Sequence, residues 1–283
     1  MNDLLKTDIA IDIAARIAGE LNVKQWTDPA KDAASEVEAR VAFLKERVRA
    51  SNTKGLVLGI SGGVDSTTAG KLCQKAVEQL RAEGYNAKFI AVRLPFYVQR
   101  DEEDAQMALR FINPDDIATV DIGQSVDAMM GSLSGQHAGD EKQIDFVKGN
   151  VKARARMIAQ YALANMHNCL VVGSDHAGEG LNGFFTKFGD GGVDVNPLNG
   201  LVKSQVREIA KVMGAPEKLV IKTPTADLEE LDPGKPDEVA YGCSYQEVDD
   251  FLLGKPVSAQ VAKLLIDRYA KTAHKREMPY VPA

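Results

Sequence analysis

Hydrophobic positions along the chain follow two spacings that together predict an α/β protein. Short apolar runs predict buried strands at 55–60, 87–94, 117–122 and 169–174. Between them, apolar residues at helical spacing predict helices at 66–83, 101–111, 123–131 and 145–167. Strands that alternate with helices of this length indicate a parallel sheet covered on both faces. Because parallel crossovers are right-handed, a doubly wound sheet is the simplest arrangement.

The same spacing predicts further helices on both sides of this core. They fall at 8–21 and 34–50 before it and at 203–213, 244–253 and 258–273 after it. We expect a single domain over 1–283, with N-terminal helices within 8–50, an α/β core over 55–200 and C-terminal helices over 203–275. Two polar stretches, 131–141 and 223–238, fit either plain surface linkers or mobile loops that close over a ligand.

Composition limits the cellular compartment and the classes of binding partner that we expect. A formal net charge of −6 over 283 residues disfavours an extended nucleic-acid surface, which needs a basic face. Cys73, Cys169 and Cys243 lie far apart and without metal-ligand spacing, which is typical of reduced thiols. Acidic residues in the first turns disfavour a signal peptide, and no apolar run reaches the roughly 20 residues that cross a bilayer. We therefore expect a cytoplasmic protein with no membrane partner.

A glycine-rich turn after the first predicted strand carries the main chemical signal. The strand 55–60 leads into Ser61-Gly62-Gly63-Val64-Asp65-Ser66, and a helix follows at once. Adjacent glycines let backbone amides approach an anion, and a helix N-terminus attracts negative charge. Open α/β sheets bind ligands at the carboxyl ends of their strands. The turn therefore predicts a phosphate-binding loop.

Other loop classes fit this turn less well. It lacks the Gly-Lys-Ser/Thr ending of a Walker A loop and the spacing of a dinucleotide-binding G-x-G-x-x-G. Gly-Gly with Ser and Asp is also common turn chemistry, but its position between a buried strand and a helix favours phosphate binding. An acidic residue beside phosphates requires a cation between them, so Asp65 is a candidate Mg²⁺ ligand.

The SGGVDS turn resembles the SGGxDS signature of the ATP pyrophosphatases, which cleave ATP between the α- and β-phosphates. Further segments are similar, in the same order, to ammonia-dependent NAD synthetases, whereas the first fifty or so residues are less similar. The matching segments are RLPFYVQRDEEDAQ (93–106), GNVKARARMIAQYALAN (149–165), VVGSDHAGEGLNGFFTKFGDGGVDVNPLNGLVKSQVREIA (171–210), TPTADLE (223–229) and HKR (274–276). The resemblance implies an adenine nucleotide alpha hydrolase-like fold and a homodimer.

The resemblance also implies which residues bind substrates. ATP contacts are implied for Gly59, Ile60, Ser61, Gly62, Gly63, Val64, Asp65, Ser66, Arg93, Gln99, Ser174, Lys203 and Thr225. Contacts to deamido-NAD are implied for Arg154, Lys187, Asp194, His274 and Lys275, and Mg²⁺ ligands for Asp65 and Glu179. Ser174 stands where the family usually has threonine, and the retained hydroxyl preserves the contact.

Other charged residues have two interpretations. Asp190 is a candidate for positioning ammonium and accepting its proton. Lys152 and Arg156, near the start of a helix, fit either a ligand-facing role or a solvated basic face. His176 fits a hydrogen-bonded structural histidine better than a catalyst. Together with the resemblance, these interpretations give Asp65, Lys203 and Asp190 as the catalytic candidates.

The implied activity is a ligase reaction that forms a C–N bond. The nicotinate carboxylate of deamido-NAD attacks the α-phosphorus of ATP, pyrophosphate leaves, and ammonia displaces AMP from the acyl-adenylate to give NAD. About fifty residues lie outside the synthetase segments, too few for a glutaminase domain, so ammonia is the expected nitrogen source. Two rival classes are a tRNA-modifying ATP pyrophosphatase, which predicts a basic face, and a nucleotide-binding module without turnover.

Overall fold

A four-stranded parallel sheet forms the centre of the protein. The computed structural model describes residues 2–98, 101–136, 139–225, 228–277 and 279–282. The strands are β1 (Gly55–Gly59), β2 (Lys88–Arg93), β3 (Asp116–Thr119) and β4 (Leu170–Val171). They lie in the order β3-β2-β1-β4, and Leu56 of β1 pairs with Phe89 of β2 and Leu170 of β4. The order reverses direction between β1 and β4, which confirms the predicted doubly wound sheet.

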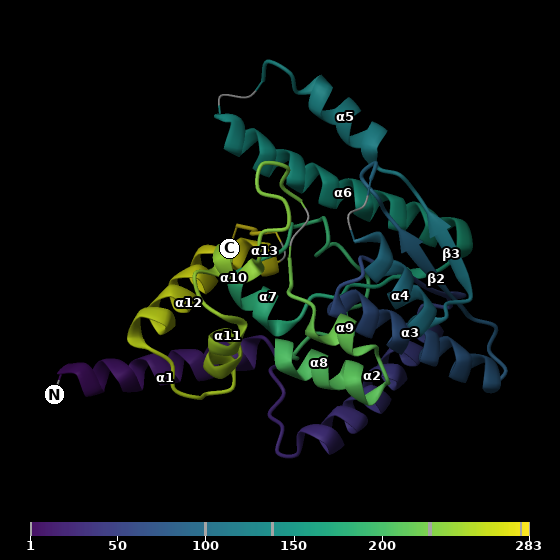
Figure 1. The fold of residues 1–283 in the computed structure, drawn as a ribbon. Coiled ribbons are helices and arrows are strands. Elements are labelled where there is room, and N and C mark those ends of the chain that lie inside the picture. Colours follow the sequence, from purple (N-terminus) through teal and green to yellow (C-terminus); the bar gives the residue numbers. More distant parts are fainter. Residues whose placement is uncertain (1, 99–100, 137–138, 226–227, 278, 283) are drawn as a thin grey trace.

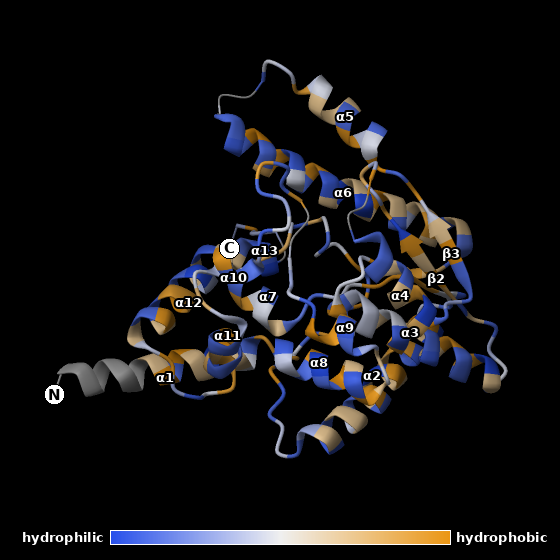
Figure 2. Ribbon diagram, viewed as in Figure 1, coloured by the Kyte–Doolittle hydropathy of each residue, from blue (hydrophilic) through white to orange (hydrophobic). Residues whose placement is uncertain are grey.

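Helices cover both faces of the sheet (Figure 1). One face packs against α2 (Pro29–Ala50), α3 (Val64–Ala82), α4 (Glu102–Ile112) and α8 (Lys203–Val212). The other face packs against α5 (Gly123–Ser132) and α6 (Glu141–His167). Leu56 and Leu58 of β1 belong to the first core and Val57 to the second, as the alternation along a strand requires. Hydrophobic residues are dense along β2 (Figure 2).

Further helices build a third hydrophobic cluster beside the carboxyl edge of the sheet. They are α1 (Asn2–Glu20), α7 (Ala177–Asn182), α10 (Asp237–Tyr241), α11 (Tyr245–Leu252) and α12 (Ala259–Lys271). Leu181, Tyr241 and Leu265 lie at the centre of this cluster. Two short helices, α9 (Glu217–Ile221) and α13 (Ala273–Arg276), complete the described chain. The N-terminal helix α1 thus packs against α12, near the other end of the chain (Figure 1).

Two predicted strands are longer in the sequence pattern than in the structure. The segment 117–122 is a strand only within Asp116–Thr119, and 169–174 only at Leu170–Val171. The pairing of β1 with β4 ends at Val57 and Val171. Two residues further along β1, the Gly59 N–H donates to Gln160 Oε1 of α6 at 2.7 Å. The strands therefore separate at their carboxyl ends, where a doubly wound sheet opens its ligand crevice. The short helices α7, α9, α10 and α13 were not predicted, because four to six residues give too little periodicity.

Part of the stretch 223–238 is docked on α6. We call residues 228–231 the strap. Asp145 of α6 accepts hydrogen bonds from the amides of Glu230 and Leu231, both at 2.9 Å. Lys152 donates to the carbonyl of Leu228 at 3.0 Å and forms an ion pair with Glu230 at 2.8 Å. The buried Asp145 and Lys152 therefore hold the strap closed on the helix.

Two further expectations concern loops and membranes. In the stretch 131–141, α5 ends at Ser132 and α6 begins at Glu141, while residues 137–138 lie outside the described residues. Among the helices that the structure describes, none is long and apolar enough to span a bilayer.

Candidate active site

The SGGVDS loop turns sharply between β1 and α3. Gly62 adopts a φ of +88°, and a Cβ at this position would come within 2.6 Å of the amide nitrogen of Ala105 in α4. Only glycine fits both the backbone angle and the contact. Val64 anchors the other end of the loop, because it is buried against Ala210 of α8 and Val220 of α9. The loop is therefore held by three helices.

The start of α3 leaves its amides available to an anion. Within the described residues, no side chain caps this N-terminus. The hydroxyls of Ser61 and Ser66 lie 3.1 Å apart, and those of Thr67 and Thr68 each donate to a carbonyl one turn earlier at 2.7 Å. Because the threonine hydroxyls are already used, the backbone amides and the helix dipole supply the attraction for a phosphate.

Asp65 forms a buried ion pair with Lys203, the first residue of α8. Lys203 Nζ lies 2.6 Å from Asp65 Oδ2, and the lysine is only 1% exposed. Asp249 of α11 fixes the start of α8 by accepting the amides of Lys203 and Ser204 at 3.0 and 2.7 Å. Burial by itself would raise the pKa of Asp65, but Lys203, together with the more distant Arg207, holds it below its ordinary value. Asp65 is therefore an ionised carboxylate.

A second carboxylate comes from the loop after β4. His176 is the N-cap of α7, and its Nδ1 accepts the Gly178 N–H at 3.1 Å. Glu179 Oε2 accepts the His176 N–H at 3.1 Å and completes a capping box. Asp65, His176 and Glu179 each offer a ligand atom within 4.8 Å of the others. Burial, Asp65 and Asp175 raise the pKa of Glu179 well above its ordinary value.

This pair of carboxylates fits a divalent cation. Asp65 Oδ1 is buried and has no hydrogen-bond partner within the described part of the chain. Two nearby carboxylates repel each other unless a positive charge lies between them, and Asp175 close by adds to the repulsion. Oxygen donors from two strand ends are the ligands that Mg²⁺ prefers. Asp65 and Glu179 could therefore hold Mg²⁺ beside the phosphate-binding loop.

The loop 183–190 and the C-terminal tail form a second group of polar side chains. Lys187 Nζ donates to the carbonyls of His274 and Glu277, the latter at 3.2 Å. Lys275 Nζ donates to two carbonyls of the loop, each at 2.8 Å. Arg154 of α6 donates to the carbonyl of Lys187 at 3.3 Å. The loop 183–190, α6 and the C-terminal tail thus meet here, and lysine and arginine side chains link them by donating to backbone carbonyls.

Known proteins share this fold and most of this sequence. The NAD synthase family matches residues 36–279. The chain belongs to the NAD synthase family. It is 55% identical over 275 residues to the NH(3)-dependent NAD(+) synthetase of Streptomyces coelicolor, covering 96% of this chain and 98% of that protein.

Solved structures agree with this assignment to the NAD synthase family. The NAD+ synthetase from Burkholderia pseudomallei has a TM-score of 0.80 and 50% identity, covering 94% of this chain and 98% of that one. The NMN synthetase from Francisella tularensis has a TM-score of 0.77 and 32% identity, covering 91% and 99%. The expected adenine nucleotide alpha hydrolase-like fold is thereby confirmed, and neither rival class is favoured.

The other residues that we expected to contact ATP lie on separate elements outside the SGGVDS loop. Arg93, at the end of β2, donates to both carboxylate oxygens of Glu102 at 2.8 and 2.7 Å. Ser174 is half-buried in the loop between β4 and α7. Thr225 forms an isolated antiparallel bridge with Pro236, at the base of the segment that carries the strap. Gln99 lies outside the described residues.

The two remaining aspartates differ in environment. Asp194 accepts the Val171 N–H at 2.8 Å and the Tyr161 hydroxyl at 3.1 Å, so it supports β4 from the side. Asp190 is exposed and accepts the Thr186 N–H at 2.8 Å. Burial and then the charge of Asp190 raise the pKa of the nearby Asp175. Asp190 therefore belongs electrostatically to the cluster at the carboxyl ends of the strands, although it comes from a later loop.

Sequence analysis missed two polar residues of the site. Burial, Asp190 and Asp65 raise the pKa of Asp175 to about 8. Tyr245 of α11 lies with its ring 5.0 Å from Lys203 Nζ and its hydroxyl 2.8 Å from Asp237 Oδ2. Asp175 was detectable, because it stands directly in the loop after a strand. Tyr245 was not, because only tertiary packing brings α11 to α8.

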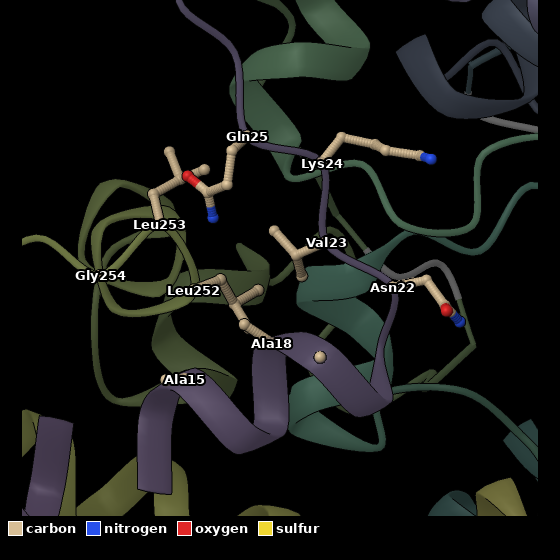
Figure 3. Close-up of a pocket in the computed structure, with 10 residues that line it drawn as sticks. Ala15, Ala18, Asn22, Val23, Lys24, Gln25, Leu252, Leu253 and Gly254 are labelled. Carbon is tan, nitrogen blue, oxygen red and sulfur yellow. The ribbon is translucent and has the colours of Figure 1, made fainter. Parts of the chain in front are cut away.

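A cavity of about 490 Å³ lies elsewhere, between α1, the segment 22–25 and the end of α11. Leu252 and Val23 face it from opposite sides, with Lys24 and Asn22 at its edge (Figure 3). Its lining includes none of the predicted substrate or metal residues. The cavity is therefore separate from the chemistry described above.

Proposed function

We propose that the chain catalyses the ATP-dependent amidation of deamido-NAD by ammonia, giving NAD, AMP and pyrophosphate. The buried Asp65–Lys203 pair carries this proposal, because it joins the phosphate-binding loop to a fixed cation at the start of α8. Glu179 adds a second carboxylate at the same point of the sheet. Relatives with more than half of their residues identical are named NH(3)-dependent NAD(+) synthetases, which supports ammonia as the nitrogen source.

The first step needs charge stabilisation at a leaving pyrophosphate. The nicotinate carboxylate forms a bond to the α-phosphorus of ATP, and the bond from that phosphorus to the β-phosphate oxygen breaks. Backbone amides at the start of α3 and the ammonium of Lys203 bind the phosphate oxygens as their charge grows. Asp65 and Glu179 would hold Mg²⁺, which would supply further positive charge to the phosphates.

The second step needs ammonia beside the activated carbonyl. Asp190 binds ammonium through its negative charge and accepts the proton that is lost before attack. Ammonia then forms the C–N bond, its nitrogen releases one further proton to solvent, and AMP leaves with the oxygen that came from the carboxylate. The side chains supply position and electrostatics, and the reaction uses no covalent enzyme intermediate.

We assign the substrate contacts by element. ATP binds residues 59–66 with Arg93, Gln99, Ser174, Lys203 and Thr225, of which Arg93 exchanges part of its pairing with Glu102 for the ligand. Deamido-NAD binds Arg154, Lys187, Asp194, His274 and Lys275. The convergence of loop 183–190, α6 and the C-terminal tail supports this second assignment.

The proposal extends to assembly and location. Residues 1–283 form one domain, because α1 packs with α11 and α12 in a cluster that also contains α7 from the loop after β4. The chain forms a homodimer through α6, whose Phe146, Ile158 and Met166 are exposed. Three free cysteines, all buried, support a reducing, cytoplasmic environment.

An ¹⁸O-labelling assay tests both the products and the fate of the carboxylate oxygen. The chain is incubated with ATP, Mg²⁺, ammonium and deamido-NAD that carries ¹⁸O in its nicotinate carboxylate. The expected products are equal amounts of NAD, AMP and pyrophosphate, with one ¹⁸O in the phosphate of AMP. ADP in place of AMP, or AMP without ¹⁸O, would refute the acyl-adenylate route.

Two controls sharpen this assay. Nicotinate mononucleotide in place of deamido-NAD tests whether the adenylate half is required, since one structural relative is an NMN synthetase. An equal kcat/KM for the mononucleotide would argue against deamido-NAD as the preferred substrate. Asp65→Asn is expected to lower kcat/KM at least ~100-fold, because it removes a charged group at the reacting phosphates.

A further inference from the structure

His176 is a buried side chain that the proposed reaction does not use. It is 2% exposed and lies beside Asp65 and Glu179. Its Nδ1 accepts the Gly178 N–H at 3.1 Å, as the N-cap of α7. An imidazole nitrogen that accepts an N–H keeps its lone pair free of a proton, so a neutral ring carries its proton on Nε2.

The other ring nitrogen is a donor without an acceptor. His176 Nε2 is buried and has no hydrogen-bond partner within the residues that the structure describes. Glu179 Oε2 lies 3.8 Å from this nitrogen, beyond hydrogen-bond range. Asp65 Oδ1 in the same cluster is a buried acceptor that also has no partner among the described residues. A buried donor and a buried acceptor each cost stability until they are satisfied.

We propose that His176 is a neutral hydrogen-bond donor to the Asp65–Glu179 carboxylate pair and not a ligand of the cation that this pair holds. The proposal rests on the metal role assigned above. Nδ1 is occupied by Gly178, and a protonated Nε2 has no lone pair to offer a metal. The cation then meets only oxygen ligands, which favours Mg²⁺ or Mn²⁺ over Zn²⁺.

Two substitutions separate the capping role from the donor role. In His176→Asn, the side-chain oxygen takes the place of Nδ1, so the cap of α7 is kept and the donor is lost. In His176→Gln, the longer amide places its N–H near the position of Nε2, so a donor is kept and the cap is weakened. A residue that only caps α7 would lose stability in the Gln variant and nothing else.

The proton position can be measured directly. We would label histidine with ¹⁵N and record long-range ¹H–¹⁵N spectra of the full chain, assigning His176 by its loss in His176→Asn. The expected pattern is that of a neutral ring protonated on Nε2, both without metal and with saturating Mg²⁺. An Nδ1–H ring, or loss of the Nε2 proton when Mg²⁺ is added, would overturn the proposal.

Metal affinity gives the second readout, with Mn²⁺ followed by electron paramagnetic resonance. We expect His176→Gln to bind Mn²⁺ within about threefold of the parent chain and His176→Asn to bind about tenfold more weakly, the usual range for a lost outer-shell hydrogen bond. Unchanged affinity in His176→Asn would overturn the donor role, and equal loss in both variants would indicate a ligand. Neither readout needs turnover, so absence of NAD formation by the parent chain would refute the proposed function separately.

Discussion

At the residue scale, one ion pair links stability to chemistry. Lys203 is buried with its ammonium on Asp65, while Glu179 crowds the same carboxylate. Breaking a buried pair by removing one partner leaves an uncompensated charge, whereas removing both does not. Loss of Asp65 should therefore lower the free energy of unfolding less than loss of Lys203, because loss of Asp65 also relieves its repulsion with Glu179.

A double-mutant cycle tests this inequality. We expect Lys203→Met to lower the free energy of unfolding by about 3 kcal/mol, Asp65→Asn by less, and the double variant to recover much of the loss. Urea denaturation of the four proteins measures the coupling. A coupling energy near zero would contradict the buried pair.

The pair between Arg93 and Glu102 predicts a pH dependence. Hydrogen bonds from Arg93 and Gln106 lower the pKa of Glu102 from its ordinary 4.5 to about 2. Because the folded pKa lies below the unfolded one, the stabilisation is complete above pH 5 and declines as the pH falls toward 2. Glu102 is exposed, so solvent screening limits the effect to about 1 kcal/mol. Denaturation of Glu102→Gln beside the parent chain should show a gap in unfolding free energy at pH 7 that narrows below pH 5 and closes only below about pH 2. A gap that stays constant over this range would contradict the assignment.

At the element scale, the loop after β1 depends on its contact with α4. Gly62 and Gly84 have similar positive φ values, +88° and +81°, but a Cβ meets Ala105 N at 2.6 Å in the first case and nothing within 4 Å in the second. Gly84→Ala is therefore a matched control that carries the backbone strain without the clash.

We expect Gly84→Ala to cost about 1 kcal/mol of stability and to leave kcat/KM unchanged. Gly62→Ala should cost more and should also lower kcat/KM, because relief of the clash moves the loop away from α4. Thermal unfolding and the product assay measure the two effects. Equal behaviour of the two variants would show that the contact with α4 is unimportant.

The strap gives a second prediction at this scale. Asp145 accepts the amides of Glu230 and Leu231, and neither amide has another acceptor among the hydrogen bonds of the described residues. Asp145→Ala should free the strap, speed limited proteolysis within 223–236 and raise the KM for ATP more than it changes kcat. Lys142→Ala, on the same helix, is the control. Unchanged proteolysis would mean that Asp145 does not hold the strap.

At the scale of the whole molecule, α6 connects most of what surrounds the site. It packs on β1 through Gln160, holds the strap through Asp145 and reaches the loop 183–190 through Arg154. It also exposes large apolar residues, including Ile158, which is 63% exposed. An exposed apolar helix face on a structural helix is typical of a subunit interface.

This face predicts the assembly. Ile158→Lys should weaken a dimer at least ~10-fold, because it places a charge in an apolar contact. Val239 on α10 is 62% exposed, about as much as Ile158, so Val239→Lys is the control and should leave the dimer intact. Sedimentation equilibrium measures both. A dimer with the same dissociation constant in both variants would place the interface elsewhere.

The sequence by itself determined the sheet, its covering helices and the loop that binds phosphate. These depend on local spacing: apolar runs at 55–60 and 87–94 became β1 and β2, and SGGVDS stands directly between β1 and α3. Turn chemistry and periodicity act within a few residues, so the printed chain carries them. Family resemblance added Lys203 and Glu179, which lie far along the chain from Asp65.

Only the tertiary structure decided how these residues meet. Lys203 Nζ comes within 2.6 Å of Asp65, 138 residues earlier, because α8 packs on α2 and α3. The contact of Tyr245 with Lys203 and the docking of the strap on α6 likewise follow from packing. So does the burial of His176 Nε2 without a partner among the residues that the structure describes. Contacts between distant segments depend on how whole helices fill space, and no local pattern records that.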